Sequence, residues 1–170
     1  MSANAILSRL RQFLLGLTGC LFLGTLVELV FTGHTQEPVQ LIPFVLCGLG
    51  LLAVSAALIR PRRKILLALR VCMSLVALGS LFGLYEHITN NAEFYLEIHP
   101  QATILETVAA ALGGANPLVA PGILALAAIM AVSATYAHPA LNKATRSQFD
   151  RSGEPRFSQE ETAWKTTINP

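Results

Sequence analysis

The sequence predicts an all-α integral membrane protein, a bundle of four transmembrane helices with both termini on the cytoplasmic side. Of its 170 residues, 53% are hydrophobic and only 13% are charged, about half the charge of a typical soluble domain. It also contains four apolar runs of about 20 residues, each long enough as a helix to cross the roughly 30 Å hydrocarbon core of a bilayer. These runs are residues 13–31, 41–59, 65–84 and 118–137.

Polar or helix-breaking residues separate the predicted spans. Residues 32–38 are polar and follow the first run, and residues 60–64 (Arg-Pro-Arg-Arg-Lys) end the second. Proline cannot continue a helix interior and a basic cluster cannot enter hydrocarbon, so we expect a tight turn there. Pro117 opens the fourth run, a position that suits proline because the first N–H groups of a helix are unpaired. Arg70 lies inside the third run, near enough to its start for the long side chain to reach the headgroups.

The placement of lysine and arginine predicts the orientation. All 12 basic residues lie before the first run, in or beside the turn between runs two and three, or in the C-terminal tail, and the connections 32–40 and 85–117 contain none. Lysine and arginine collect on the cytoplasmic side of membrane proteins. We therefore expect a membrane domain over 1–139 in a bacterial cytoplasmic (inner) membrane, with N-in, C-in topology. The polar, charged composition of 140–170 predicts a disordered cytoplasmic tail.

The outer connection between spans three and four, residues 85–117, is long enough to expect a function. Residues 92–98 alternate polar and apolar side chains, which fits an extended stretch on the bilayer surface or a short helix. His99-Pro100 favours a break, and we expect a helix from Pro100 to Leu112 that ends at Gly113-Gly114. One face of this helix is apolar, so it should lie in the membrane interface. That face carries Ile104, Leu105, Val108 and Leu112.

Small residues recur at four-residue spacing in three of the runs. They are Gly16, Cys20 and Gly24 in the first, Gly79 and Gly83 in the third, and Ala127, Ala131 and Thr135 in the fourth. Such stripes let helices approach closely in lipid. They can serve packing within the bundle, or contact with a membrane-protein partner or with a second copy of the chain.

Carboxylates and histidines gather on the predicted outer side, where no lysine or arginine is available to pair with them. An ionisable side chain within a span usually marks a functional site, and Glu28 lies just inside the outer end of the first run. Its expected neighbours at the same depth are Tyr85, Glu86 and His87. The full set of candidate metal-binding residues is Glu28, His34, Glu86, His87, Glu93, Glu97 and His99.

Three interpretations of this outer cluster are open. The side chains can simply be hydrated and hydrogen-bonded to headgroups and loop amides. They can instead form a cation or proton site, because histidine nitrogen with carboxylate oxygen suits zinc, copper, nickel or iron. The third is haem ligation by His34 and His87. No cofactor is required by the sequence, and a divalent metal is the one that this cluster suits best.

We expect a non-enzymatic accessory or scaffold subunit of a larger membrane complex, because nucleophile motifs and phosphate loops are lacking. The alternatives are a cation, metal or proton transporter or sensor that uses the outer cluster, and a haem-binding membrane subunit. The expected partners are the lipid bilayer and other membrane proteins or a second copy. Nucleic acid is not expected, because topology accounts for the basic residues.

Overall fold

The computed structural model describes residues 3–142, and every regular element within them is helical. The elements are α1 (Ala3–Phe31), the 3-10 turn η1 (Pro38–Leu41), α2 (Ile42–Ile59), α3 (Arg63–Ile98), α4 (Ile104–Gly113) and α5 (Val119–Ala134). Three segments are long and apolar enough to cross a membrane, namely Asn4–Phe31, Pro38–Ile59 and Arg63–Ile98. The structure therefore confirms that residues 3–142 are all-helical, with three long apolar helices, as expected of a membrane protein. At 16 residues, α5 is about 24 Å long.

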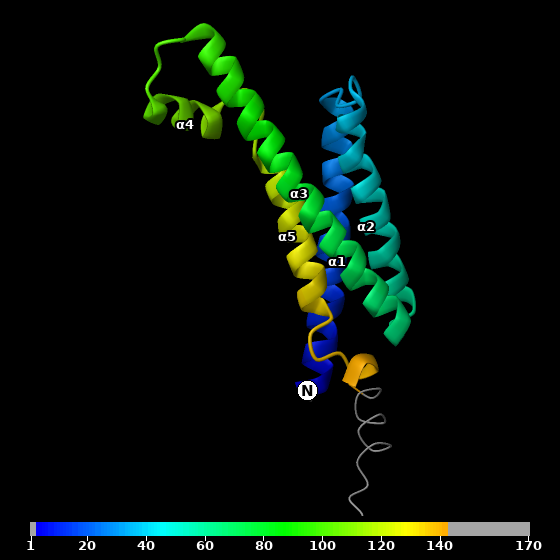
Figure 1. Ribbon diagram of the computed structural model, residues 1–170. Coiled ribbons are helices and arrows are strands. Elements are labelled where there is room, and N and C mark those ends of the chain that lie inside the picture. Colours follow the sequence, from blue (N-terminus) through cyan, green and yellow to red (C-terminus); the bar gives the residue numbers. More distant parts are fainter. Residues whose placement is uncertain (1–2, 143–170) are drawn as a thin grey trace, which may run out of the picture. The chain divides into compact units, whose positions relative to one another are not determined.

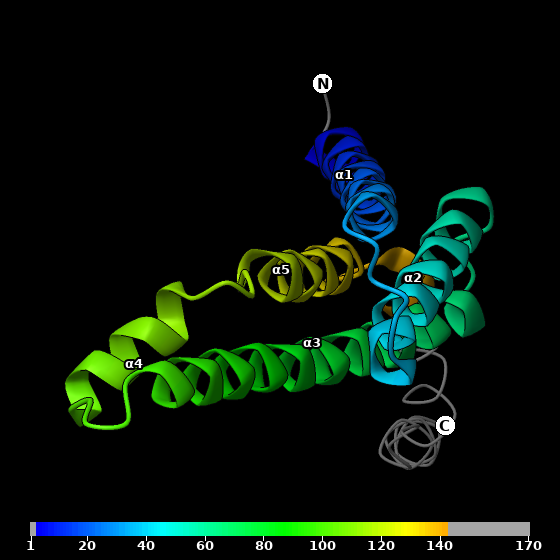
Figure 2. The ribbon, with the colours of Figure 1, turned by 90° about the horizontal axis from the view of Figure 1, so that it is seen from above.

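Of the described residues, 3–136 form one compact unit and 137–142 belong to a second. In the first unit, four helices pack in a closed ring, in which α1 contacts α2, α2 contacts α3, α3 contacts α5, and α5 contacts α1 (Figures 1 and 2). In the second unit, the amides of Leu141 and Asn142 donate to the carbonyl of His138. The predicted disordered tail lies almost wholly outside the described residues.

One face of α1 supplies much of the core of the ring. Leu15, Thr18, Phe22, Thr25 and Leu29 are buried, and their spacing of three or four residues keeps them on one side of the helix. The Phe22 ring lies against α2 at a glycine, Gly50, where a Cβ atom would come within 2.6 Å of the ring. Only glycine at this position allows the two helices to pack so closely.

The two glycines of α3 lie where this helix packs against its neighbours in the ring. A Cβ atom on Gly79 would lie 2.3 Å from a methyl carbon of Leu46 on α2, and one on Gly83 would contact Pro121 on α5. The Ser80 hydroxyl, which lies between them, donates to the carbonyl of Pro121. The GxxxG motif therefore brings α3 close to both of its neighbours within the same chain.

The small-residue face of α1 has a different environment. A Cβ atom on Gly16 or Gly24 would meet no atom of the described chain within 4 Å, and Cys20 between them is exposed. This face therefore points away from the other helices of the ring.

Two arginines cap the C-terminal end of α5. Arg11 donates to the carbonyl of Tyr136 (3.1 Å), and Arg70 donates through Nε to Thr135 Oγ1 (2.7 Å) and through Nη2 to the Thr135 carbonyl (3.3 Å). The last carbonyls of a helix lack intrahelical partners and favour a nearby cation. Arg70 thus binds a helix end rather than the headgroups that we expected. The helix ends at Ala134, three residues before the predicted end of the fourth run.

Beyond the predicted third span, α3 continues as a helix as far as Ile98. Residues 92–98 are therefore helical rather than extended, and the break follows at His99-Pro100. α4 begins later than we predicted because Thr103 is its N-cap, with Thr103 N donating to Glu106 Oε2 (2.8 Å) and Glu106 N donating to Thr103 Oγ1 (3.4 Å). This reciprocal capping box satisfies amides at the helix start.

The outer part of α3 and α4 form a projection that we call the arm, residues 85–113. It extends past the ends of the other helices, with α4 folded back beside α3 (Figure 1). Asn91, only 3% exposed, donates to the carbonyls of Ala111 (3.1 Å) and Asn116 (3.0 Å) and accepts from the Asn116 amide (2.8 Å). Gly114 follows α4, and a Cβ atom there would lie 2.6 Å from Asn91 Cγ. Asn91 thus fixes both ends of the segment that returns from α4 to α5.

Candidate functional site

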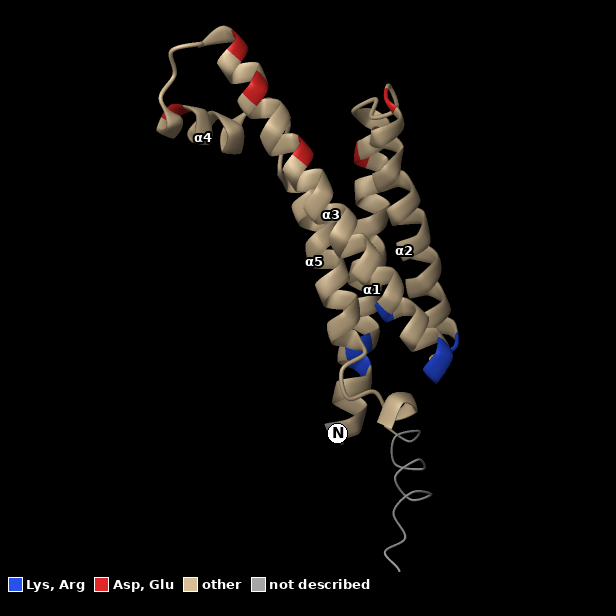
Figure 3. Cartoon of the chain, in the orientation of Figure 1, with Lys and Arg blue, Asp and Glu red and all other residues tan. Residues whose placement is uncertain are grey.

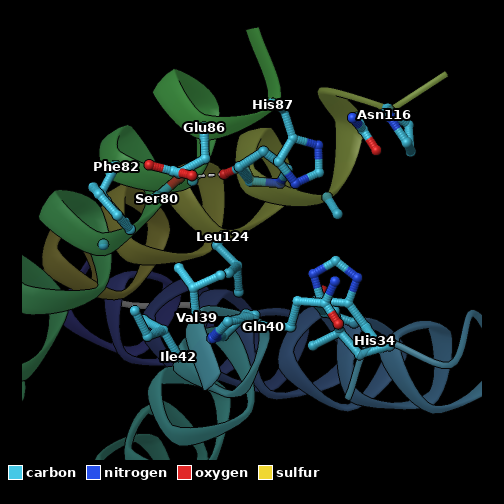
Figure 4. A pocket seen from close by; sticks show the side chains of 18 of the residues that line it. His34, Val39, Gln40, Ile42, Ser80, Phe82, Glu86, His87, Asn116 and Leu124 are labelled. Atoms are coloured by element: carbon cyan, nitrogen blue, oxygen red, sulfur yellow. Dashed lines mark hydrogen bonds between the residues drawn. The ribbon is translucent and has the colours of Figure 1, made fainter. Parts of the chain in front are cut away.

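A cavity of about 510 Å³ lies at the end of the ring opposite the basic α2–α3 turn, and we call it the glutamate cavity. One wall comes from α1, the following loop, η1 and α2, and the other comes from α3, the α4–α5 connection and α5 (Figure 4). Its ionisable lining residues are Glu28, His34, Glu37, Glu86 and His87. Of the residues that the structure describes, no lysine or arginine lines it. Figure 3 shows the same separation, with carboxylates at this end and basic residues at the other.

The loop after α1 places two of the ionisable groups. The amide of His34 donates to the carbonyl of Leu29 (3.0 Å), and Gly33 has φ +64, a left-handed conformation that glycine adopts without strain. Further along, Gln40 Oε1 accepts from the amides of Gln36 (2.8 Å) and Glu37 (3.4 Å). These bonds fold the loop over the end of α1, so His34 and Glu37 lie along the rim with Glu28.

The two imidazoles approach each other from opposite walls (Figure 4). The ring centroids of His34 and His87 are 6.4 Å apart, with a tilt of 32° between the planes. Partial burial, and the neighbouring His87, lower the pKa of His34 below its ordinary value of 6.5. His34 is therefore a neutral imidazole at neutral pH. Among the described residues, His87 Nδ1 is buried without a hydrogen-bond partner.

Thr25 also lines the cavity, and its hydroxyl is unusual. Thr18, Thr32, Thr89 and Thr107 each donate to the carbonyl four residues earlier, the common local bond of helical threonines. Thr25 is only 2% exposed, yet its Oγ1 has no hydrogen-bond partner in the described chain. A buried hydroxyl left unpaired costs about 1–3 kcal/mol, so Thr25 is an unsatisfied polar group in the wall of the cavity.

The structure brings together part of the predicted cluster. Glu28, His34, Glu86 and His87 share the glutamate cavity. The other candidates are exposed on the arm, and they are Glu93, Glu97 and His99. Tyr85, an expected neighbour of Glu28, is 62% exposed and does not line the cavity, so that expectation is wrong. It faces outward because one residue along a helix turns the side chain by about 100°.

The donors surround the cavity instead of meeting at one point. Among the described residues, no group of three or more His, Cys, Asp or Glu side chains is placed to hold a metal ion. The metal and haem alternatives remain predictions. Sequence reasoning missed Thr25 as a lining residue, although its position three residues before Glu28 puts both on one helix face.

Towards the basic end, the interior of the ring becomes apolar. Phe22, Leu69, Met73 and Val76 are fully buried there. The arrangement is thus a one-sided polar cavity above an apolar core, which suits reversible binding at one end. No protein-family model matches this chain, and no curated protein or solved structure is similar to it.

Proposed function

We propose that this chain is a four-span protein of a bacterial cytoplasmic membrane, with both termini inside. Although α5 is short, it packs against both α1 and α3, two helices that are long and apolar enough to span. A helix inserted between two spans lies at the same depth as they do. The basic residues of the described ring lie at one end (Figure 3), which the positive-inside rule assigns to the cytoplasm.

Within that membrane, we propose that the protein is a non-enzymatic accessory or scaffold subunit of a larger complex. The observation that carries this proposal is the contrast between the GxxxG glycines of α3 and the small-residue stripe of α1. The space beside the two glycines of α3 is occupied by Leu46 and Pro121 of the same chain, whereas Gly16 and Gly24 of α1 face open space. A small-residue stripe that its own bundle leaves open suits the close approach of a helix from another protein.

The arm supports the same proposal. Its α4 helix exposes Ile104, Leu105, Val108 and Leu112, and the adjoining end of α3 exposes Phe94, Leu96 and Ile98. A projecting hairpin with this many apolar side chains suits contact with a partner or with the membrane interface. The Asn91 hydrogen bonds hold it in one shape, which favours a docking role over a flexible connection.

Extraction in mild detergent tests the proposal. The protein should elute in a particle well above its own 18.2 kDa after the detergent contribution is subtracted. The double variant Gly16→Leu/Gly24→Leu should release it from that particle, because leucine fills the open face. Gly48→Leu is the matched control, since a Cβ atom there also meets nothing within 4 Å. A bare monomer in several mild detergents, or equal release by the control, would contradict the proposal.

Labelling with a membrane-impermeant thiol reagent tests the topology. In intact spheroplasts, Gln36→Cys should be labelled and Arg62→Cys should react only after lysis. The reverse pattern, or labelling of both residues from outside, would refute the proposed orientation.

A further inference from the structure

The lining of the glutamate cavity suits a multiply charged organic cation. Its three carboxylates come from separate segments, with Glu28 on α1, Glu37 in the loop and Glu86 on α3. Glu28 lies in the last turn of α1, where the negative end of the helix dipole adds to its charge. With no lysine or arginine among the described lining residues, these charges have no counter-ion within the cavity wall.

Size and donor placement favour an organic ligand over a bare metal ion. The volume of about 510 Å³ falls within the range of small-molecule sites, roughly 300–1,000 Å³. A dehydrated metal needs several donors at about 2 Å from one point, and among the described residues no such group exists. Apolar side chains also line the cavity, including Leu29, Val39 and Leu124. Such a wall suits the methylene segments of a ligand whose charged groups are spaced apart.

Thr25 supplies an independent sign of a ligand. Its hydroxyl is buried and unpaired in the described chain, although three other helical threonines, and Thr32 just after α1, make the local bond to a backbone carbonyl. Thr25 lies one turn below Glu28, about 4.5 Å along the helix axis. The hydroxyl oxygen is covered in the unliganded chain, and a change of its χ1 rotamer would let it accept a hydrogen bond from an ammonium group that enters between the carboxylates.

We propose that the glutamate cavity binds an aliphatic polyamine, with its ammonium groups at Glu28, Glu37 and Glu86 and its methylene segments along the apolar wall. An alkylammonium group donates up to three hydrogen bonds, and the carboxylates and the Thr25 hydroxyl accept them. This inference rests on the cavity alone and is independent of the proposed role as a subunit.

Titration of the full-length protein with spermidine, in nanodiscs of zwitterionic lipid, tests the proposal. We expect saturable 1:1 binding that weakens with salt. Each of Glu28→Gln, Glu37→Gln and Glu86→Gln should weaken it by about ten-fold, as for loss of one charge-assisted hydrogen bond. Glu93→Gln and Glu97→Gln are matched controls on the arm, outside the cavity. They should leave the affinity unchanged.

Other outcomes overturn the proposal. Equal weakening by the arm variants would show attraction to surface charge alone. Absence of saturable spermidine binding would refute the site. Tighter binding of Zn²⁺, lost in the same cavity variants, would make it a metal site instead.

Thr25→Val gives a second test, because it should raise the stability of the protein and lower its spermidine affinity. Valine keeps the shape but removes the unpaired hydroxyl, so the unliganded protein should melt at a higher temperature while spermidine binding weakens a few-fold. Thr18→Val is the control, because Thr18 is fully buried, bonded to the Leu14 carbonyl and outside the cavity. It should not stabilise the protein or change binding. Unchanged spermidine affinity in Thr25→Val would overturn the role assigned to the hydroxyl.

Discussion

Replacement of Asn91 should loosen the arm without unfolding the helix ring. The side chain makes three hydrogen bonds, two to the carbonyls of Ala111 and Asn116 and one from the Asn116 amide. At about 1 kcal/mol net for each bond, Asn91→Ala removes roughly 3 kcal/mol from the stability of the arm. That loss corresponds to an increase of roughly 100-fold in local opening. Asn91→Asp should cost at least as much, because its carboxylate faces two carbonyl oxygens in a buried site.

Hydrogen exchange measured by mass spectrometry can check this value. Amides of residues 104–116 should exchange roughly 100-fold faster in Asn91→Ala, whereas amides in the core of α1 and α2 should keep their rates. Asn90→Ala is the matched control, because Asn90 is the adjacent residue and is exposed. If the amides of residues 104–116 exchange at the same rate in Asn91→Ala and in Asn90→Ala, the hydrogen bonds of Asn91 do not hold the arm in place.

Three further perturbations have defined outcomes. Gly50→Ala should destabilise the protein by about 1–3 kcal/mol in a denaturation assay, because the new methyl meets a buried ring; Gly48→Ala, in open space, should not. Thr103→Ala should lower the helicity of α4 by removing an N-cap worth about 1 kcal/mol. The pKa of Glu106 is lowered chiefly by the backbone amide of Thr103 and then by its hydroxyl, so in this variant an NMR titration should show it rising part of the way towards 4.5. Because the pKa of Glu106 is lower in the folded protein, its ionised carboxylate stabilises the fold above pH 4.5. This stabilisation is lost as the pH falls through the pKa that Glu106 has in the folded protein. Spermidine affinity should be constant from neutral pH down to pH 6.5, where the ligand is fully protonated. It should fall below pH 6.5 as His34, whose pKa is lowered, gains a proton; an affinity that rises on acidification would refute this. The titratable groups facing that imidazole are Glu28 from α1, Glu37 from the loop, and Glu86 and His87 from α3.

Hydrophobic pattern and charge predict much of the fold. The runs 13–31, 41–59 and 65–84 lie within the three long apolar helices, because composition over about 20 residues decides whether a segment suits lipid. The pattern says less about where a helix ends. α3 runs on to Ile98 since the polar residues after the apolar run are compatible with a helix, and only His99-Pro100 stops it.

Side-chain contacts between distant residues could not be predicted. Asn91 and Asn116 carry no pattern that marks them as partners, and Arg70 reaches Thr135 across 65 positions of sequence. Part of the cavity could be anticipated, because the ends of neighbouring spans bring Glu28, Glu86 and His87 to one depth. The role of Thr25 in the cavity depends on a hydrogen bond that its hydroxyl does not make, and only the side-chain geometry shows this.

The two ends of the ring satisfy their charges in different ways. At the basic end, Arg11 and Arg70 bond to the carbonyls that close α5, so the fold itself supplies acceptors for the buried Arg11 and the half-buried Arg70. At the acidic end, Glu106 receives the amide of its own helix start, but Glu28 lies at the wrong end of α1 for such a bond. In the proposed orientation, lysine and arginine stay on one side of the membrane, so the carboxylates of the glutamate cavity have no lysine or arginine partner among its described lining residues. The proposed polyamine would supply that counter-charge from outside the chain.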